Sequence, residues 1–481
     1  MKKRPNATPS GPAGHSRQAF QGGTYSLMLT AAVLALLIVL NLLVSALPTS
    51  LTQYDISASK LYSVTSNTKS VVNALTEDVT IYWIVQAGEE DEVIEKLLDR
   101  YESLSDHITV EKRNPDVYPT FAEQYTDGTV YNNSLVVECG DRSRYISNTD
   151  IYLTDASLYS YSYSTSFDGE GAITSAIDYV TNPDQPVVYT LTGHGEGELP
   201  ATFADDLEKE NILVEELSLL NSDEIPEDAA CLIVYAPQSD ISEAEREMLA
   251  GYVEDGGRLL VMAGPVEDEE LPNLYGLLEP YGVTAADGIV VEGDREHYAF
   301  SSPAALMPDL AESDITTPLA EEGYYVILPL AVGLTVGENT TSATVTSLLS
   351  TSDAAYSKLA GYDMATYEKE DGDIDGPFSL AVEASYENGG GLIWISSSAY
   401  LDDMYNAYSS GANVNFTMNA VSQLIGESET LSIRAKSLNY NYLTISDSVS
   451  GLLQVLMIGL IPLAFLGAGI AVVVRRRRLQ K

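Results

Sequence analysis

Hydrophobic residues follow two different patterns along this chain. Near each end lies a long apolar stretch without charge, over residues 25–47 and 449–474. Either stretch is long enough to cross a hydrocarbon core of about 30 Å as a helix, which takes roughly 20 residues. Between them, apolar residues recur at strand-like and helix-like spacings in alternation. The pattern predicts an α/β protein in which two terminal transmembrane helices bracket a large body.

Basic residues at the chain ends predict how the two helices are oriented. Flanks rich in Lys and Arg stay in the cytoplasm, so we expect the tails 1–24 and 475–481 inside and residues 48–448 outside the cell membrane. The flanking residues are Lys2, Lys3, Arg4 and Arg17 before the first stretch, and Arg475, Arg476, Arg477, Arg478 and Lys481 after the second. A cleaved signal peptide ending near Ala46 is the competing interpretation, but the apolar run exceeds the roughly 7–15 residues of such a peptide. We therefore expect an uncleaved anchor and a multi-pass membrane protein.

The body between the two stretches is strongly acidic. The chain has 70 Asp and Glu against 25 Lys and Arg, for a net charge of −45, and every acidic residue lies between the stretches. Binding nucleic acid or anionic lipid head groups requires Lys and Arg to replace counterions, so the composition excludes nucleic acid as a partner. Solubility explains the acid excess; a preference for cations is the alternative.

The first part of the body, residues 48–182, predicts a small α/β domain. The expected elements are a strand at 79–85, a helix at 89–104, a strand at 108–112, a short helix at 119–125 and a hairpin formed by 131–138 and 144–147. This order is that of a thioredoxin-like unit without a CxxC motif, because Cys139 and Cys231 are the only cysteines and we expect both as buried thiols. Residues 151–166, rich in Tyr, Ser and Thr, predict an exposed connector, and an edge strand with Tyr on one face, or a sticky surface, is the alternative.

The second part, residues 183–430, predicts a larger Rossmann-like domain. Its strands alternate with helices at the spacing of a parallel sheet that has helices on both faces. Ser242 and Glu245 form the capping box expected at the start of one helix. The expected strands are 187–191, 213–217, 230–235, 258–263, 288–292, 378–384 and 391–396, and the expected helices are 203–211, 242–253 and 413–425. Residues 431–448 then form a juxtamembrane linker.

A glycine-rich loop offers the first candidate site. Gly193, His194, Gly195 and Glu196 follow the first strand of the second domain, at the carboxyl edge where open α/β sheets bind ligands. A His beside carboxylates could bind a divalent metal or transfer protons. Alternatively, the glycines turn the chain and His194 caps the loop. Because the spacing matches neither a P-loop nor the dinucleotide-binding fingerprint, the structural alternative is favoured.

An acidic turn offers a weaker candidate. Asp371, Asp373 and Asp375 copy the opening of a D-x-D-x-D-G calcium loop, but position 12, which requires a bidentate Glu, is Val382. A solvated acidic turn is the favoured interpretation, and weak calcium binding is the alternative. We expect no cofactor.

Sequence signatures of catalysis are missing. The chain has no GxSxG elbow, no HExxH motif and no Cys at a strand-to-helix turn with Gly around it. His107, His194 and His297 have no evident nucleophile partner in the sequence. We expect a protein that is not an enzyme, and an envelope hydrolase that uses His194 and Glu196 is the alternative.

Several short motifs, in their order along the chain, resemble the Gldg family. These proteins are auxiliary extracytoplasmic components of ABC transport systems, named after gliding motility. The likeness covers nearly the whole length and includes the two predicted anchors. The motifs are YDIS at 54–57, LYSVT at 61–65, FDGE at 167–170, TSAI at 174–177, LTGHGE at 191–196, GGRLL at 256–260, YGV at 281–283 and GPF at 376–378.

The resemblance implies a partnership with an ABC-2-type permease and a cytoplasmic ATPase, rather than an activity within this chain. The sequence has no P-loop and no further apolar stretches that would make a permease, so both functions would come from other subunits. The expectation is a non-catalytic auxiliary membrane subunit of an ABC-type transport or export complex. The alternative is a stand-alone extracytoplasmic protein that binds or senses a ligand or cation near His194.

Overall fold

The computed structural model describes residues 28–39, 61, 63–157, 162–222, 224–321, 323–426 and 436–437, with positions 461, 462, 467, 469 and 475. The chain divides into two compact units, Met1–Ser437 and Leu438–Lys481, and the architecture below is that of the first. Residues 28–39 form a helix with exposed apolar side chains. Apart from these residues and positions 461, 462, 467 and 469, the predicted spans 25–47 and 449–474 lie outside the described residues, as do most of the tails and of the linker 431–448. Within the described ranges, no helix is both long enough and apolar enough to cross a membrane.

A four-stranded sheet forms the core of the first domain, with the strand order β2-β1-β3-β4. β1 and β2 are parallel, while β3 is antiparallel to β1 and β4 is antiparallel to β3. The elements are α3 (Ser66–Asn73), β1 (Val79–Ile84), α4 (Glu92–Leu104), β2 (Ile108–Arg113), η1 (Ala122–Gln124), β3 (Ser134–Cys139), β4 (Arg142–Ile146) and α6 (Gly169–Thr181). From β1 to β4 they follow the predicted series, with a 3-10 turn in place of the short helix; α3 was not predicted. This mixed sheet, together with its helices, is compatible with the thioredoxin-like unit that we expected.

Helix α4 illustrates how the local sequence produces this fold. The Asp91 carboxylate accepts the backbone N–H groups of Val93 and Ile94 at 2.8 and 3.1 Å, which satisfies amides that lack partners in a first helical turn. The buried face of the helix is formed by Ile94, Leu97, Leu98 and Tyr101. Because these residues recur at helical spacing, α4 packs with α3 and α6 over the sheet.

Residues 151–166, expected as an exposed connector, form most of a β-hairpin instead. β5 (Tyr152–Ser157) follows the short helix α5 (Asn148–Ile151) and pairs antiparallel with β6 (Ser162–Phe167). β22 (Lys436–Ser437) pairs with the other edge of β6, so a segment from near the C-terminus completes this three-stranded sheet. The connector prediction is wrong because alternating Tyr with Ser or Thr also satisfies the two-residue period of a strand.

A ten-stranded sheet forms the core of the second domain, in the order β11-β16-β20-β21-β10-β9-β7-β8, while β17 also pairs with β20 and β14 pairs with β17. The neighbours from β21 to β8 are parallel, as predicted, but those from β20 to β11 are antiparallel. A fully parallel sheet is therefore wrong: β20 and β21 are joined by a turn of a few residues, which can connect only antiparallel strands. The strands are β7 (Val187–Leu191), β8 (Leu213–Leu217), β9 (Ala229–Tyr235), β10 (Arg258–Met262), β11 (Val283–Ala285), β14 (Asp309–Leu310), β16 (Leu334–Val336), β17 (Thr344–Ser350), β20 (Ser379–Ser385) and β21 (Gly391–Ile395).

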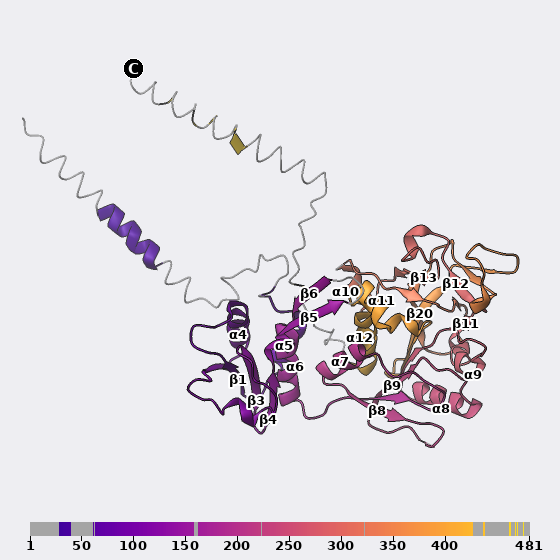
Figure 1. The fold of residues 1–481 in the computed structure, drawn as a ribbon, viewed down its shortest axis with the longest axis horizontal. Helices are drawn as coiled ribbons and strands as arrows, with labels where there is room; N and C mark the ends of the chain where they lie inside the picture. Colours follow the sequence, from indigo (N-terminus) through magenta and orange to yellow (C-terminus); the bar gives the residue numbers. More distant parts are fainter. Residues whose placement is uncertain are drawn as a thin grey trace, which may run out of the picture. The chain divides into compact units, whose positions relative to one another are not determined.

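Helices cover both faces of the large sheet, as Figure 1 shows around β9. Alternate residues of β9 enter two separate hydrophobic cores, Cys231 and Ile233 on one face and Leu232 and Val234 on the other. The first core is closed by α7 (Ala201–Lys209) and α12 (Ala412–Ile425), and the second by α8 (Glu243–Glu254) and α9 (Pro272–Tyr275). Cys139 and Cys231 are both buried and unbridged, which confirms the prediction of two buried thiols.

The irregular stretch before β20 contains short elements, several of which contribute buried residues such as Val290 and Leu328 to the first core. β12, β18 and β19 form a three-stranded sheet, and β13 pairs with β15. The elements are η2 (Glu279–Tyr281), β12 (Ile289–Val291), η3 (Arg295–His297), β13 (Ala305–Leu306), α10 (Thr317–Glu321), β15 (Leu328–Pro329), β18 (Tyr356–Lys358), η4 (Gly361–Asp363) and β19 (Ile374–Asp375), followed after β21 by η5 (Ala399–Leu401) and α11 (Asp403–Tyr408).

Asn211 connects the two domains. It lies just after α7, is buried, and has a φ of 59°, a left-handed conformation that Asn tolerates better than most residues. Its side-chain amide donates to the carbonyl of Ser175 and to the Asp178 carboxylate, both at 2.9 Å, and accepts from Arg144. These polar contacts join α6 and β4 of the first domain to the second.

Candidate functional site

The His194 loop lies at the carboxyl end of β7, where the sequence predicted it. Gly193 and Gly195 have φ values of 129° and 74°, which residues with a side chain rarely adopt, so the glycines make the turn possible. The His194 ring lies between two carboxylates, with Nδ1 3.5 Å from Glu196 Oε1 and Nε2 3.3 Å from Glu245 Oε2. All three side chains are nearly enclosed, at 11%, 4% and 6% exposure.

Contacts of the main chain tie this loop to its neighbours. The Glu196 carboxylate accepts the His194 N–H at 2.7 Å, and the His194 carbonyl accepts the N–H groups of Gln238 and Ser239, both at 3.0 Å. Glu245 also closes the predicted capping box of α8, accepting the Ser242 N–H at 2.8 Å. Both ring nitrogens of His194 thus face carboxylates that also accept backbone N–H groups of this region. This geometry supports the structural interpretation, in which His194 joins the loops after β7 and β9 to the start of α8.

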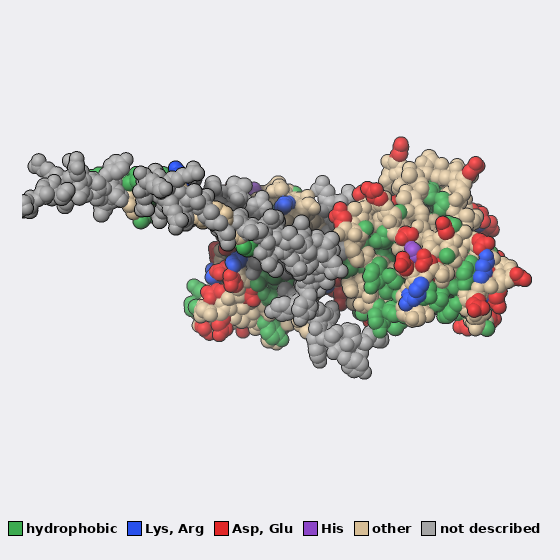
Figure 2. All heavy atoms as spheres, turned by 90° about the horizontal axis from the view of Figure 1, so that it is seen from above, with side chains coloured by type: hydrophobic (Ala, Val, Ile, Leu, Met, Phe, Trp, Pro, Cys, Tyr) green, Lys and Arg blue, Asp and Glu red, His purple; other side chains and the backbone are tan. Residues whose placement is uncertain are grey.

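The acidic turn at 371–375 does not assemble a metal-binding group. Asp373 Oδ2 lies 3.1 Å from the ammonium of Lys358, whose side chain is fully buried, and Asp375 pairs with Lys369. Asp373 also accepts the backbone N–H groups of Leu359 and Glu370. Across the ranges that the structure describes, no set of three or more His, Cys, Asp or Glu side chains is placed to hold a metal ion. Figure 2 shows acidic side chains spread over the face in view rather than gathered at one point.

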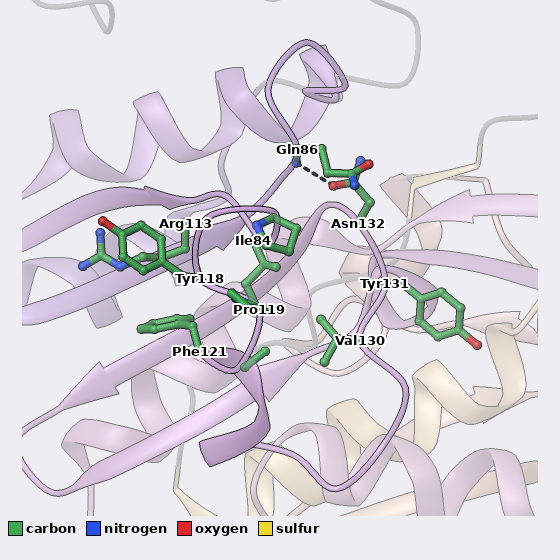
Figure 3. Close-up of a pocket in the computed structure, with 11 residues that line it drawn as sticks. Ile84, Gln86, Arg113, Tyr118, Pro119, Phe121, Val130, Tyr131 and Asn132 are labelled. Carbon is green, nitrogen blue, oxygen red and sulfur yellow. Dashed lines mark hydrogen bonds between the residues drawn. The ribbon is translucent and has the colours of Figure 1, made fainter.

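The structure also contains a pocket that the sequence reasoning missed, here called the β1–β2 pocket. It has a volume of about 370 Å³ and lies where the parallel strands β1 and β2 end (Figure 3). The only sequence signal was the run of proline and aromatic residues that follows β2. The lining residues are Ile84, Gln86, Arg113, Pro115, Tyr118, Pro119, Phe121, Ala122, Val130, Tyr131 and Asn132.

Arg113 and Gln86, two polar residues of the β1–β2 pocket, have protein partners. The Arg113 guanidinium pairs with Glu111 and stacks over the ring of Phe121, 5.4 Å from its centroid. The backbone N–H of Gln86 donates to the Asn132 side chain at 2.9 Å, the dashed line in Figure 3. The remaining wall is aromatic and aliphatic, and its volume falls in the range of about 300–1,000 Å³ that ligand pockets occupy. The pocket therefore suits a small apolar or aromatic group.

A buried cluster surrounds Glu170, in the FDGE motif at the start of α6. Glu170 is 2% exposed; its Oε1 accepts the backbone N–H of Thr65 at 2.5 Å and the Thr68 hydroxyl at 2.7 Å. Its Oε2 accepts from the Lys436 ammonium at 2.8 Å. Tyr101 and Thr174 extend this network, because the Tyr101 hydroxyl bonds to the Thr174 hydroxyl and the Thr68 and Thr174 hydroxyls lie 2.9 Å apart. We call these six residues the Glu170 cluster.

The other residues of the FDGE motif are buried as well. Phe167 ends β6 and is buried, and a Cβ added to Gly169 would lie only 2.5 Å from the Phe167 ring, so only glycine fits there. Asp168 is 8% exposed, and its Oδ1 has no hydrogen-bond partner among the described residues. Burial raises the pKa of Asp168 to about 7, while the nearby Lys209 ammonium acts in the opposite direction.

Comparison with known families and structures adds a second line of evidence. Residues 185–388 match the family described as an ABC-type uncharacterized transport system, and residues 58–153 match a domain of unknown function, DUF7088. The first match lies within the second domain and makes that domain similar to the ABC-type transport system family. A comparison with curated proteins found no significant match.

Similar solved structures include the mmIFT52 N-terminal domain and PurLQS from Thermotoga maritima. The first shares 19% identity at a TM-score of 0.37 and covers 50% of this chain and 97% of that one. The second shares 10% identity at a TM-score of 0.25 and covers 51% and 97%. Likeness at this level carries no argument about function.

Proposed function

We propose that this chain is a non-catalytic auxiliary subunit of an ABC-type transport complex, acting with a separate ABC-2-type permease and a cytoplasmic ATPase. The observation that carries the proposal is the match of residues 185–388 to the ABC-type transport system family. In this proposal residues 25–47 and 449–474 anchor the protein in the cell membrane. Both termini are cytoplasmic, and the acidic body lies outside.

Features of the chain ends support the anchoring part of the proposal. Neither apolar stretch contains Asp, Glu, Lys or Arg, and Lys and Arg flank both. In the helix of residues 28–39, Met28 and Leu36 are 72% and 69% exposed. A helix with this much exposed apolar surface needs lipid or another protein to cover it.

Affinity capture tests the proposal directly. The full-length protein, tagged at its C-terminus, is extracted in a mild detergent after crosslinking, and the proteins captured with it are identified. We expect a permease and an ATPase. A variant in which both apolar stretches are replaced by unrelated apolar sequences of equal length serves as the control and should lose both. Recovery of the chain alone would overturn the proposal.

The β1–β2 pocket favours a second candidate, a stand-alone protein that binds or senses an extracytoplasmic ligand. Such a ligand would raise the Tm of the natural protein but not of a Val130→Trp variant, whose indole fills part of the pocket. If small aromatic compounds raise the Tm of neither protein, the second candidate fails. If they raise the Tm of both proteins equally, binding occurs elsewhere.

A further inference from the structure

The Glu170 cluster joins three parts of the chain that are far apart in sequence. Thr65 and Thr68 follow the first apolar stretch, Glu170 begins α6, and Lys436 precedes the second apolar stretch. We infer that this cluster is a clasp that holds both ends of the body at one point and makes a displacement of either end act on the other. This inference concerns the body itself, so it goes beyond the proposed function and does not depend on it.

Glu170 is the centre of the clasp because its charge is buried. Its carboxylate is 2% exposed and is held by the Thr65 N–H, the Thr68 hydroxyl and the Lys436 ammonium at 2.5, 2.7 and 2.8 Å. A carboxylate removed from water is costly unless hydrogen bonds and a counter-charge replace the lost solvation. Loss of one of these contacts therefore leaves the Glu170 carboxylate less well compensated. Its hydrogen bonds to the other segments are then weakened as well.

Lys436 links the two ends directly as well. Its ammonium also donates to the carbonyl of Ser63 at 2.7 Å, a contact between residues 373 positions apart. Its backbone pairs in β22 with Phe167, three residues before Glu170. The side chain is only 15% exposed, so solvent screens the ion pair little. One residue of β22 thus contacts the N-terminal segment, the FDGE motif and the edge of β6.

The buried Lys436–Glu170 ion pair should matter more for stability than the surface ion pairs of the same domain. Lys96 pairs with Glu92 one helical turn away, and these side chains are 43% and 76% exposed. Exposed pairs of this kind contribute little to stability, whereas breaking a buried pair leaves an uncompensated charge. Lys96→Met is therefore a matched control for Lys436→Met, since each removes one ammonium.

Hydrogen exchange measured by mass spectrometry on the full-length protein in detergent tests the clasp. In Lys436→Met we expect peptides that cover residues 63–73 to exchange faster by on the order of a hundredfold, although the substitution lies far away in sequence. Lys96→Met should leave these peptides unchanged. Lys436→Arg keeps the charge and should retain most of the protection.

A reciprocal variant completes the test. Thr68→Val preserves shape but removes the hydroxyl, and it should accelerate exchange in the peptide containing Lys436 and Ser437 by about tenfold. Unchanged exchange at 63–73 in Lys436→Met would overturn the inference. Equal acceleration in β1 and α12 would also overturn it, because that pattern reports global unfolding rather than release of the two ends.

Discussion

A carboxylate that is buried with an unsatisfied oxygen must lose its charge or destabilise the fold, and Asp168, whose Oδ1 has no hydrogen-bond partner among the described residues, is in this position. Burial raises its pKa from 3.8 to about 7. Between these values the folded state binds a proton that the unfolded state has released, so the free energy of unfolding falls as pH rises through this window. At roughly 1.4 kcal/mol per pKa unit, the cost is on the order of 4 kcal/mol above pH 7.

Asp168→Asn removes this titration while keeping the shape of the side chain. We expect the variant to be more stable than the natural protein at pH 8, by about 2–4 kcal/mol, with the difference shrinking steadily toward pH 5. Urea unfolding at several pH values measures this difference in the free energy of unfolding. Asp184→Asn, at an exposed position, is the control and should show no such trend. A difference for Asp168→Asn that is the same at all pH values would contradict this account.

At the scale of elements, helix α8 and the His194 loop stabilise each other through Glu245. Ser242→Ala removes the cap and should cost about 1 kcal/mol. His194→Ala leaves Glu196 and Glu245 buried without the ring between them and should cost about 2 kcal/mol. Since both changes act on Glu245, the double variant should depart from additivity by more than about 0.5 kcal/mol. Urea unfolding of the four proteins checks this, and additive effects would favour the ligand-binding interpretation of His194 instead.

Elements whose pattern is local were predictable from the sequence. β1, α4 and α8 follow from the spacing of their own apolar residues and, for α8, from the capping box of Ser242 and Glu245. The direction of β20 does not follow from its apolar run, which parallel and antiparallel strands of a buried sheet share, although its short connection to β21 was a signal that could have been read. The β5–β6 hairpin was missed because its polar residues resemble those of a loop and its second edge is completed by β22.

The candidate sites likewise divide into features with a local sequence pattern and features without one. The sequence placed His194 and Glu196 correctly at the end of a strand, and it identified Glu245 as a capping residue but not as a neighbour of His194. Glu170 precedes Ile173 and Ile177 at helical spacing, so a charge on a buried helix face was a signal that could have been read. Its partner Lys436 lies 266 positions away, and no local pattern connects the two.

At the scale of the whole molecule, the acidic charge is dispersed, as the face in Figure 2 illustrates. The Asp373 and Asp375 carboxylates are engaged by Lys358 and Lys369. We therefore expect millimolar calcium and magnesium to shift the Tm equally and by less than about 1 °C. Differential scanning calorimetry measures both shifts. A larger shift specific to calcium that disappears in Asp371→Asn would restore the calcium-loop interpretation.

The position of β22 has a consequence for how the protein is made. A ribosome delivers the first domain's sheet, its helices and Glu170 long before it delivers Lys436. Until then the nascent domain has a buried carboxylate without its counter-charge and a β6 edge without its last strand. The first domain is thus synthesised first but completed last. It reaches its full stability only after the whole body, including Lys436, has been translated.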